Sequence, residues 1–94
     1  MNKEQWLSME KSPTLENDSR KDIYPKFIVW ETIDMKEKTA SGRSYCGYLN
    51  CGSGDVYDWS FIIDLNWSEK EYCMQREKIK KEVKQEVLLL QLVF

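Results

Sequence analysis

The chain has 94 residues, which suits one small domain and leaves no room for two hydrophobic cores. Apolar residues make up 41% and charged residues 32%, so the bulk of the chain is expected to fold. The net charge is −2, from 16 acidic and 14 basic residues. This balance lacks the strong basic excess of a general nucleic-acid binder and argues against a nucleic-acid partner.

Cysteine usage and the first residues bear on the cellular compartment. Three cysteines cannot all pair with one another, and the first residues are polar rather than apolar, so no secretory signal is predicted. Both observations predict a cytoplasmic protein with free thiols. No apolar run approaches the roughly 20 residues of a membrane span, so no membrane partner is expected.

Residues 1–22 come first in chain order, and their polar composition predicts a loosely held N-terminal arm, flexible or partly helical. Trp6 and Met9 are spaced three residues apart, as on one face of a short helix. The Ser12-Pro13 step predicts a break in structure, followed by a loop. We expect Trp6 to dock this arm onto a single domain formed by residues 23–94.

Two strands are predicted in the first half of that domain. Residues 24–33 are rich in β-branched and aromatic residues and predict a strand that is apolar on both faces. Residues 34–42 show no period and predict a turn or loop. Residues 43–49 predict a weaker strand, because Gly47 interrupts it. Residues 50–55 are rich in Gly, Asn and Asp and predict a hairpin turn.

Residues 56–65 carry the clearest strand pattern in the chain. Large apolar side chains alternate with mostly polar ones, which places five of them on one face: Tyr57, Trp59, Phe61, Ile63 and Leu65. Ser68 and Glu71 then have the spacing of a helix capping box, and apolar residues recur at helical spacing over about 69–88. The fold class predicted is α+β, with a three-stranded antiparallel sheet packed on one long C-terminal helix.

The absence of histidine is the most informative chemical feature, because it removes the commonest general base and the commonest metal ligand. We therefore predict no catalytic residue, no cofactor and no enzymatic activity. Cys46, Cys51 and Cys73 have the only spacing that resembles a metal site, but a structural zinc site needs four ligands. Ordinary thiols are the favoured interpretation, and a zinc-stabilised module remains an alternative.

A binding surface is predicted on the sheet face away from the helix. Its residues are Ile28, Trp30, Asp58, Ile62 and Asp64. An exposed apolar patch with acidic edges is typical of a protein-binding site, and it suits a partner protein with a basic surface. The alternative, that the N-terminal arm or a loop covers this face, is equally open from the sequence.

These features predict a small non-catalytic protein-binding module, such as an inhibitor that occupies a partner's surface. By size and composition alone, anti-CRISPR, anti-restriction, host-takeover and toxin-immunity proteins of phages and mobile elements are analogous.

The last residues, 87–94, are almost entirely apolar, and the sequence leaves open whether they form helix or strand. They either dock on the domain's own core or join two copies of the chain as a homodimer. The self-association residues predicted are Leu88, Leu89, Leu90, Leu92 and Phe94. A self-associating structural or regulatory subunit is therefore the alternative function.

Overall fold

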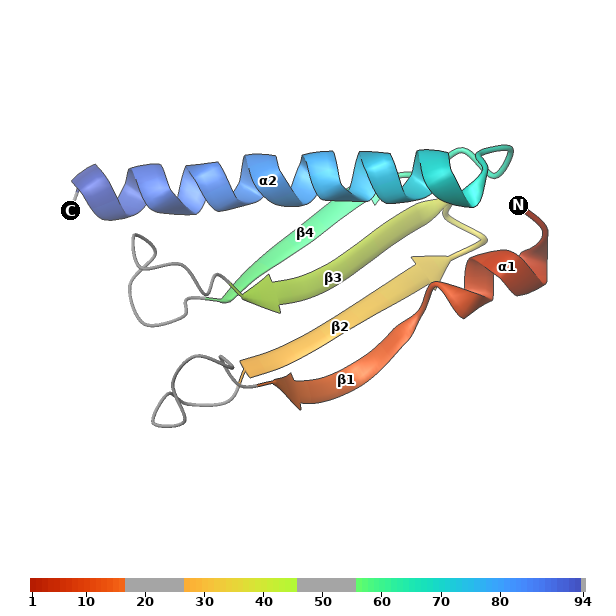
Figure 1. Cartoon of the computed structure of the whole chain (residues 1–94), viewed down its shortest axis with the longest axis horizontal. Coiled ribbons are helices and arrows are strands. Elements are labelled where there is room, and N and C mark those ends of the chain that lie inside the picture. Colours follow the sequence, from red (N-terminus) through yellow and green to blue (C-terminus); the bar gives the residue numbers. More distant parts are fainter. Residues whose placement is uncertain (17–26, 46–55, 94) are drawn as a thin grey trace.

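The computed structural model describes residues 1–16, 27–45 and 56–93. It shows an α+β fold in which a four-stranded antiparallel sheet packs against a C-terminal helix (Figure 1). The elements in chain order are α1 (Lys3–Ser8), β1 (Lys11–Glu16), β2 (Phe27–Asp34), β3 (Thr39–Tyr45), β4 (Val56–Ile62) and α2 (Glu69–Val93). The strands follow one another across the sheet in the order β1-β2-β3-β4.

The sheet has one strand more than the sequence predicted, because residues 11–16 of the expected arm form the edge strand β1. Pro13 had been taken as a break. The register between β1 and β2 shifts between Lys11 and Thr14, which is where Pro13 lies. Proline has no backbone N–H to donate, and edge strands and bulges are the places in a sheet that tolerate this loss. The break in structure predicted at Ser12-Pro13 is therefore only a register shift within β1.

The N-terminal arm is partly helical, as one of the two predicted forms, but it is not loosely held over residues 1–9, because α1 is anchored in the core. Asn2 and Gln5 form a reciprocal capping box at its start. The Trp6 side chain is fully buried, as the docking prediction required, and its indole Nε1 donates a hydrogen bond to the backbone oxygen of Leu65 at 3.3 Å. The predicted loop after β1 lies outside the described residues, as does the predicted hairpin turn at 50–55.

The strand β3 begins at Thr39, four residues before the start of the strand predicted at 43–49, in a segment predicted as a loop. Residues 46–49 of that prediction lie outside the described part of the chain. The loop between β2 and β3 is short because Asp34 Oδ1 accepts hydrogen bonds from the backbone N–H groups of Lys36 and Glu37, both at 3.0 Å. Lys38 completes the turn in the left-handed region, with φ of 55°. This short turn allows β3 to begin at Thr39.

Small residues in β3 explain why the pattern there was missed. Ala40 and Gly42 are buried on the helix side of the sheet, and Gly42 pairs with Trp59 of β4. A Cβ atom at Gly42 would lie 2.5 Å from Cε2 of the Trp59 ring and 2.7 Å from the backbone oxygen of Trp30. Weak strand formers occupy these positions because the large Trp59 ring needs the space above them.

The core lies between α2 and β4, as the period-two pattern predicted. Trp59 and Ile63 are buried and pack with Tyr72 of α2, while Phe61 stacks on Tyr72 with ring centroids 5.9 Å apart. β4 ends at Ile62, three residues before the predicted end. β2 covers the described part of the strand predicted at 24–33, whose first three residues lie outside the described ranges. The predicted placement of the aromatic row under the helix is confirmed.

The helix α2 begins where the capping pattern predicted, with Ser68 Oγ accepting a hydrogen bond from the Glu71 backbone N–H at 3.2 Å. It continues to Val93, five residues beyond the predicted end, so the last residues are helix rather than strand. Within the described ranges, no helix combines the length and the apolar character required to cross a membrane.

Candidate functional site

The sheet face opposite α2, called here the outer face, carries several exposed apolar side chains. Backbone alternation turns Val29, Glu31 and Ile33 of β2 toward α2 and turns Ile28 and Trp30 the other way. The exposed apolar side chains of this face come from three strands: Leu15, Ile28, Val56 and Ile62. Trp30 is half-buried among them.

The structure places four of the five predicted binding residues on the outer face. Ile28 is 45% exposed and Ile62 is 77% exposed, and Trp30 and Asp58 lie in one row across β2, β3 and β4. Ile62 lies four residues along β4 from Asp58, which is about 13 Å in an extended strand. Asp64 lies beyond the end of β4, where its Oδ1 accepts a hydrogen bond from the Asn66 backbone N–H at 2.9 Å.

The middle of that row holds an ion pair that the sequence did not predict. Arg43 lies between Trp30 and Asp58 in the register of the sheet. Its Nε donates to Asp58 Oδ1 at 2.6 Å, and its Nη2 donates to Oδ2 at 3.1 Å. This bidentate geometry is the strong form of an arginine–carboxylate pair, although exposure to water limits its contribution to stability. The outer face is therefore less acidic than its sequence indicated.

This pairing has a consequence for the Asp58 carboxyl group. The hydrogen bonds from Arg43 lower the pKa of Asp58 below its ordinary value, and this effect exceeds the opposing effect of partial burial. We expect an NMR titration to show Asp58 ionising at lower pH than a free aspartate. Because the pKa is lowered on folding, the stability that this pair contributes is present above the ordinary aspartate pKa and is lost as the pH falls through the folded-state value.

Arg43→Gln is the control for this titration. Removing the guanidinium should raise the Asp58 pKa toward its ordinary value while leaving the strand register intact. An unchanged pKa in that variant would contradict the assigned cause.

Three outer-face residues escaped the sequence analysis for separate reasons. Leu15 lay in the segment taken as an arm, and it pairs with Ile28 in the sheet. Val56 is the first residue of the strand predicted at 56–65, but it was not among the predicted binding residues. Arg43 could be found only by aligning β3 with β4, and the expected strand boundary was four residues off.

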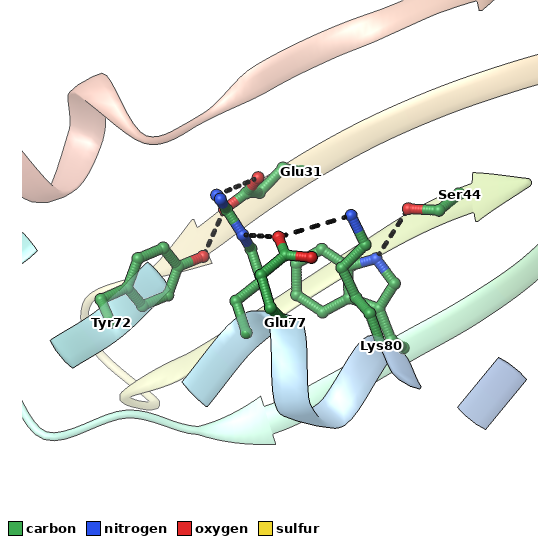
Figure 2. A network of polar contacts seen from close by, with 7 residues as sticks. Glu31, Ser44, Tyr72, Glu77 and Lys80 are labelled. Carbon is green, nitrogen blue, oxygen red and sulfur yellow. Dashed lines mark hydrogen bonds and ion pairs between the residues drawn. The ribbon is translucent and has the colours of Figure 1, made fainter. Parts of the chain in front are cut away.

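On the opposite side of the sheet, a polar network joins β2 to α2 (Figure 2). Glu31 accepts hydrogen bonds from the Tyr72 hydroxyl and, at 3.1 Å, from Arg76 Nη1 on α2. Its side chain is only 12% exposed. Burial, reinforced by the neighbouring Glu31 carboxylate, raises the pKa of Tyr72, so the hydroxyl keeps its proton and remains a donor.

The network has a structural role: its hydrogen bonds hold β2 and α2 together, and it is called here the structural tether. Glu31 is charge-compensated by Arg76, and the described residues contain no cluster of three potential metal-ligating side chains. Cys73 is a free thiol on α2, whereas Cys46 and Cys51 lie outside the described residues, so the zinc alternative remains a prediction. A tyrosine held protonated beside a paired carboxylate is a poor general base.

Comparisons with known proteins yield no match: no family model, no curated protein and no solved structure is significantly similar to the chain. Its function is therefore inferred from the geometry and chemistry of its surfaces.

Proposed function

We propose that the protein is a non-catalytic module that binds another protein through the outer face of its sheet. The observation that carries this proposal is the set of exposed apolar side chains on that face. Ile28 and Ile62 are 45% and 77% exposed on regular strands, in positions where a one-sided sheet usually carries polar residues. Apolar surface gathered on one face usually marks a binding site.

The described part of the N-terminal segment does not cover this face. Trp6 packs on Tyr72 on the helix side of the sheet, with ring centroids 5.1 Å apart, and β1 extends the sheet sideways. The alternative that these residues bury the outer face therefore has no support in residues 1–16.

A partner protein suits the chemistry of this face better than a small ligand. Its apolar side chains are spread over β1, β2 and β4 rather than gathered in a cavity. The half-buried Trp30 provides an aromatic anchor, a residue type that contributes strongly to protein interfaces. The Arg43–Asp58 pair offers both hydrogen-bond donors and acceptors beside it. The preference for a basic partner that the sequence predicted is weakened, because Arg43 already pairs with Asp58 and Asp64 lies beyond the end of β4.

Paired substitutions on the two sides of the molecule test the proposal. Ile28→Lys and Ile62→Lys place a charge on the outer face at exposed positions, where the cost in stability is small. Met74→Lys is the matched control, because Met74 is equally apolar and is 61% exposed on α2. Each variant is used for affinity capture from native cells. The affinity of each variant for the captured protein is then measured, which gives the effect of the substitution on binding.

We expect a protein that is retained by the wild type and by Met74→Lys and lost with both outer-face variants. Its affinity should fall about tenfold or more on either outer-face substitution. Capture that is equal for all variants, or lost equally with Met74→Lys, would show that the outer face is not the binding surface.

A second candidate function is self-association through the end of α2. The last residues of the sequence, 87–94, are almost entirely apolar, and α2 continues through them as far as Val93. Leu89 is 60% exposed. We propose a homodimer joined by this helical end as the alternative to a heterologous partner.

Sedimentation equilibrium tests self-association directly. A dimer that dissociates on Leu89→Lys would support this candidate, whereas a monomer at tens of micromolar, unchanged by deleting residues 88–94, would remove it. The substitution lies on α2 rather than on the sheet, so the result does not depend on the outer-face variants.

A further inference from the structure

A cavity of about 300 Å³ opens on the helix side of the sheet, next to the polar network of Figure 2. Its floor is formed by side chains of the sheet, including Glu31, Ser44 and Tyr57. Its wall is formed by Arg76 and Lys80, which lie four residues apart and therefore on one face of α2. This volume is at the lower end of the range for small-ligand sites, roughly 300–1,000 Å³.

The cavity exists because α2 covers the sheet unevenly. The helix packs mainly on β4, whereas the cavity also reaches Lys11 of β1 and Val29 of β2. Polar and charged side chains from α2 cross this uncovered part of the sheet in place of apolar ones. The described lining of the cavity therefore comes from the strands and from α2.

Basic residues outnumber acidic ones in the cavity lining. Among the described residues that form it, Lys11, Arg43, Arg76 and Lys80 are basic and Glu31 is acidic. The exposed Glu77 carboxylate contacts Arg76 and Lys80 from outside this lining. Glu31 is already satisfied by Arg76 and by the Tyr72 hydroxyl. Arg43 also borders the cavity, but its guanidinium is paired with Asp58 on the outer face.

Several donors remain for a ligand. Arg76 uses Nε and Nη1 in its hydrogen bonds to described residues, which leaves Nη2. Among the described residues, Lys80 Nζ makes one ion pair, a 3.8 Å contact with the exposed Glu77. Ser44 Oγ accepts a hydrogen bond from Trp59 Nε1 at 3.2 Å, so its own hydroxyl proton can be donated (Figure 2).

We propose that this cavity binds an oxyanion, the phosphate or carboxylate group of a small molecule, between Lys80, Arg76 and Ser44. A guanidinium, an ammonium and a hydroxyl converging on one hollow provide the charge-assisted donors that such groups require. The residue that distinguishes this role from that of the structural tether is Lys80, since it has no bond to Glu31 among the described contacts.

Titration of the full chain with inorganic phosphate, and separately with acetate, tests the proposal by ¹H–¹⁵N NMR. The indole N–H of Trp59 is the reporter, because it donates to Ser44 at the cavity floor. We expect this signal to shift and saturate at millimolar anion. The anion that binds more tightly identifies the class of ligand.

The paired variants are Lys80→Gln and Lys78→Gln. Both remove one positive charge from α2, but Lys78 is exposed and does not line the cavity. Lys80→Gln should weaken anion binding about tenfold, whereas Lys78→Gln should leave it unchanged.

The proposal is overturned if neither anion shifts the Trp59 signal, or if both variants respond like the wild type. The outer-face variants lie on the other side of the sheet and should bind the anion normally. Failure of the protein-binding proposal and failure of this one are therefore distinguishable.

Discussion

Trp6→Ala should destabilise the protein by about 3–5 kcal/mol, the usual cost of deleting a fully buried tryptophan. The ring packs edge-on against Tyr72 with an interplanar angle of 77°, and Tyr72 in turn stacks on Phe61. The substitution would leave a cavity at the centre of the aromatic cluster and remove the hydrogen bond from the indole to Leu65. Chemical denaturation followed by circular dichroism measures the loss.

Leu7→Ala is the matched control on the same short helix. Leu7 is exposed, so its removal should change the free energy of unfolding by about 0.5 kcal/mol or less. Equal effects of the two substitutions would mean that α1 is not held by Trp6, and that the N-terminal segment is the loose arm first expected from its composition.

Glu31→Ala should destabilise the fold by about 2–3 kcal/mol, because it leaves Arg76 and the Tyr72 hydroxyl without their acceptor. Breaking a fully buried ion pair costs more than this, but Arg76 is partly open to water and recovers some hydration. Thermal and chemical unfolding should both report the loss. The Tyr72 pKa should also fall, since the neighbouring negative charge helps to raise it.

Glu77→Ala provides the comparison for that result. Glu77 bonds to Arg76 as well, but its side chain is 59% exposed, so we expect a change within about 0.5 kcal/mol. A loss for Glu77→Ala as large as that for Glu31→Ala would contradict the assignment of Glu31 as the tether between β2 and α2.

The parts of the fold that were predicted correctly are those encoded in nearest-neighbour patterns. The alternation from Tyr57 onward identified the buried face of β4, and Ser68 with Glu71 marked the start of α2. Both depend only on geometry within one element, a period of two for a strand and a hydrogen-bonded cap for a helix. The same alternation left Asp58 and Ile62 on the outer face, where the structure has them.

The candidate sites depended on information that no single segment holds. Arg43 is next to Asp58 only because β3 and β4 pair in one register, and the cavity at Lys80 exists only because α2 packs on β4. Neither the pairing of β3 with β4 nor the packing of α2 on β4 can be recognised from the spacing of residues along the chain. The sequence could therefore place a predicted site residue on a face of the sheet, but it could not identify the side chains that this residue contacts.

The α+β class, the inward face of β4 and the start of the long helix all follow from residue patterns along the chain. The place of the N-terminal segment in the sheet and the assignment of Gly42 to a strand emerge only when the elements are packed together. Pro13 and Gly42 are poor strand formers on their own, and the neighbouring strand and the Trp59 ring respectively favour their positions in the sheet. The strand propensity of a residue depends on its own segment, whereas the free energy of packing depends on the side chains and strands that lie next to that segment in the fold.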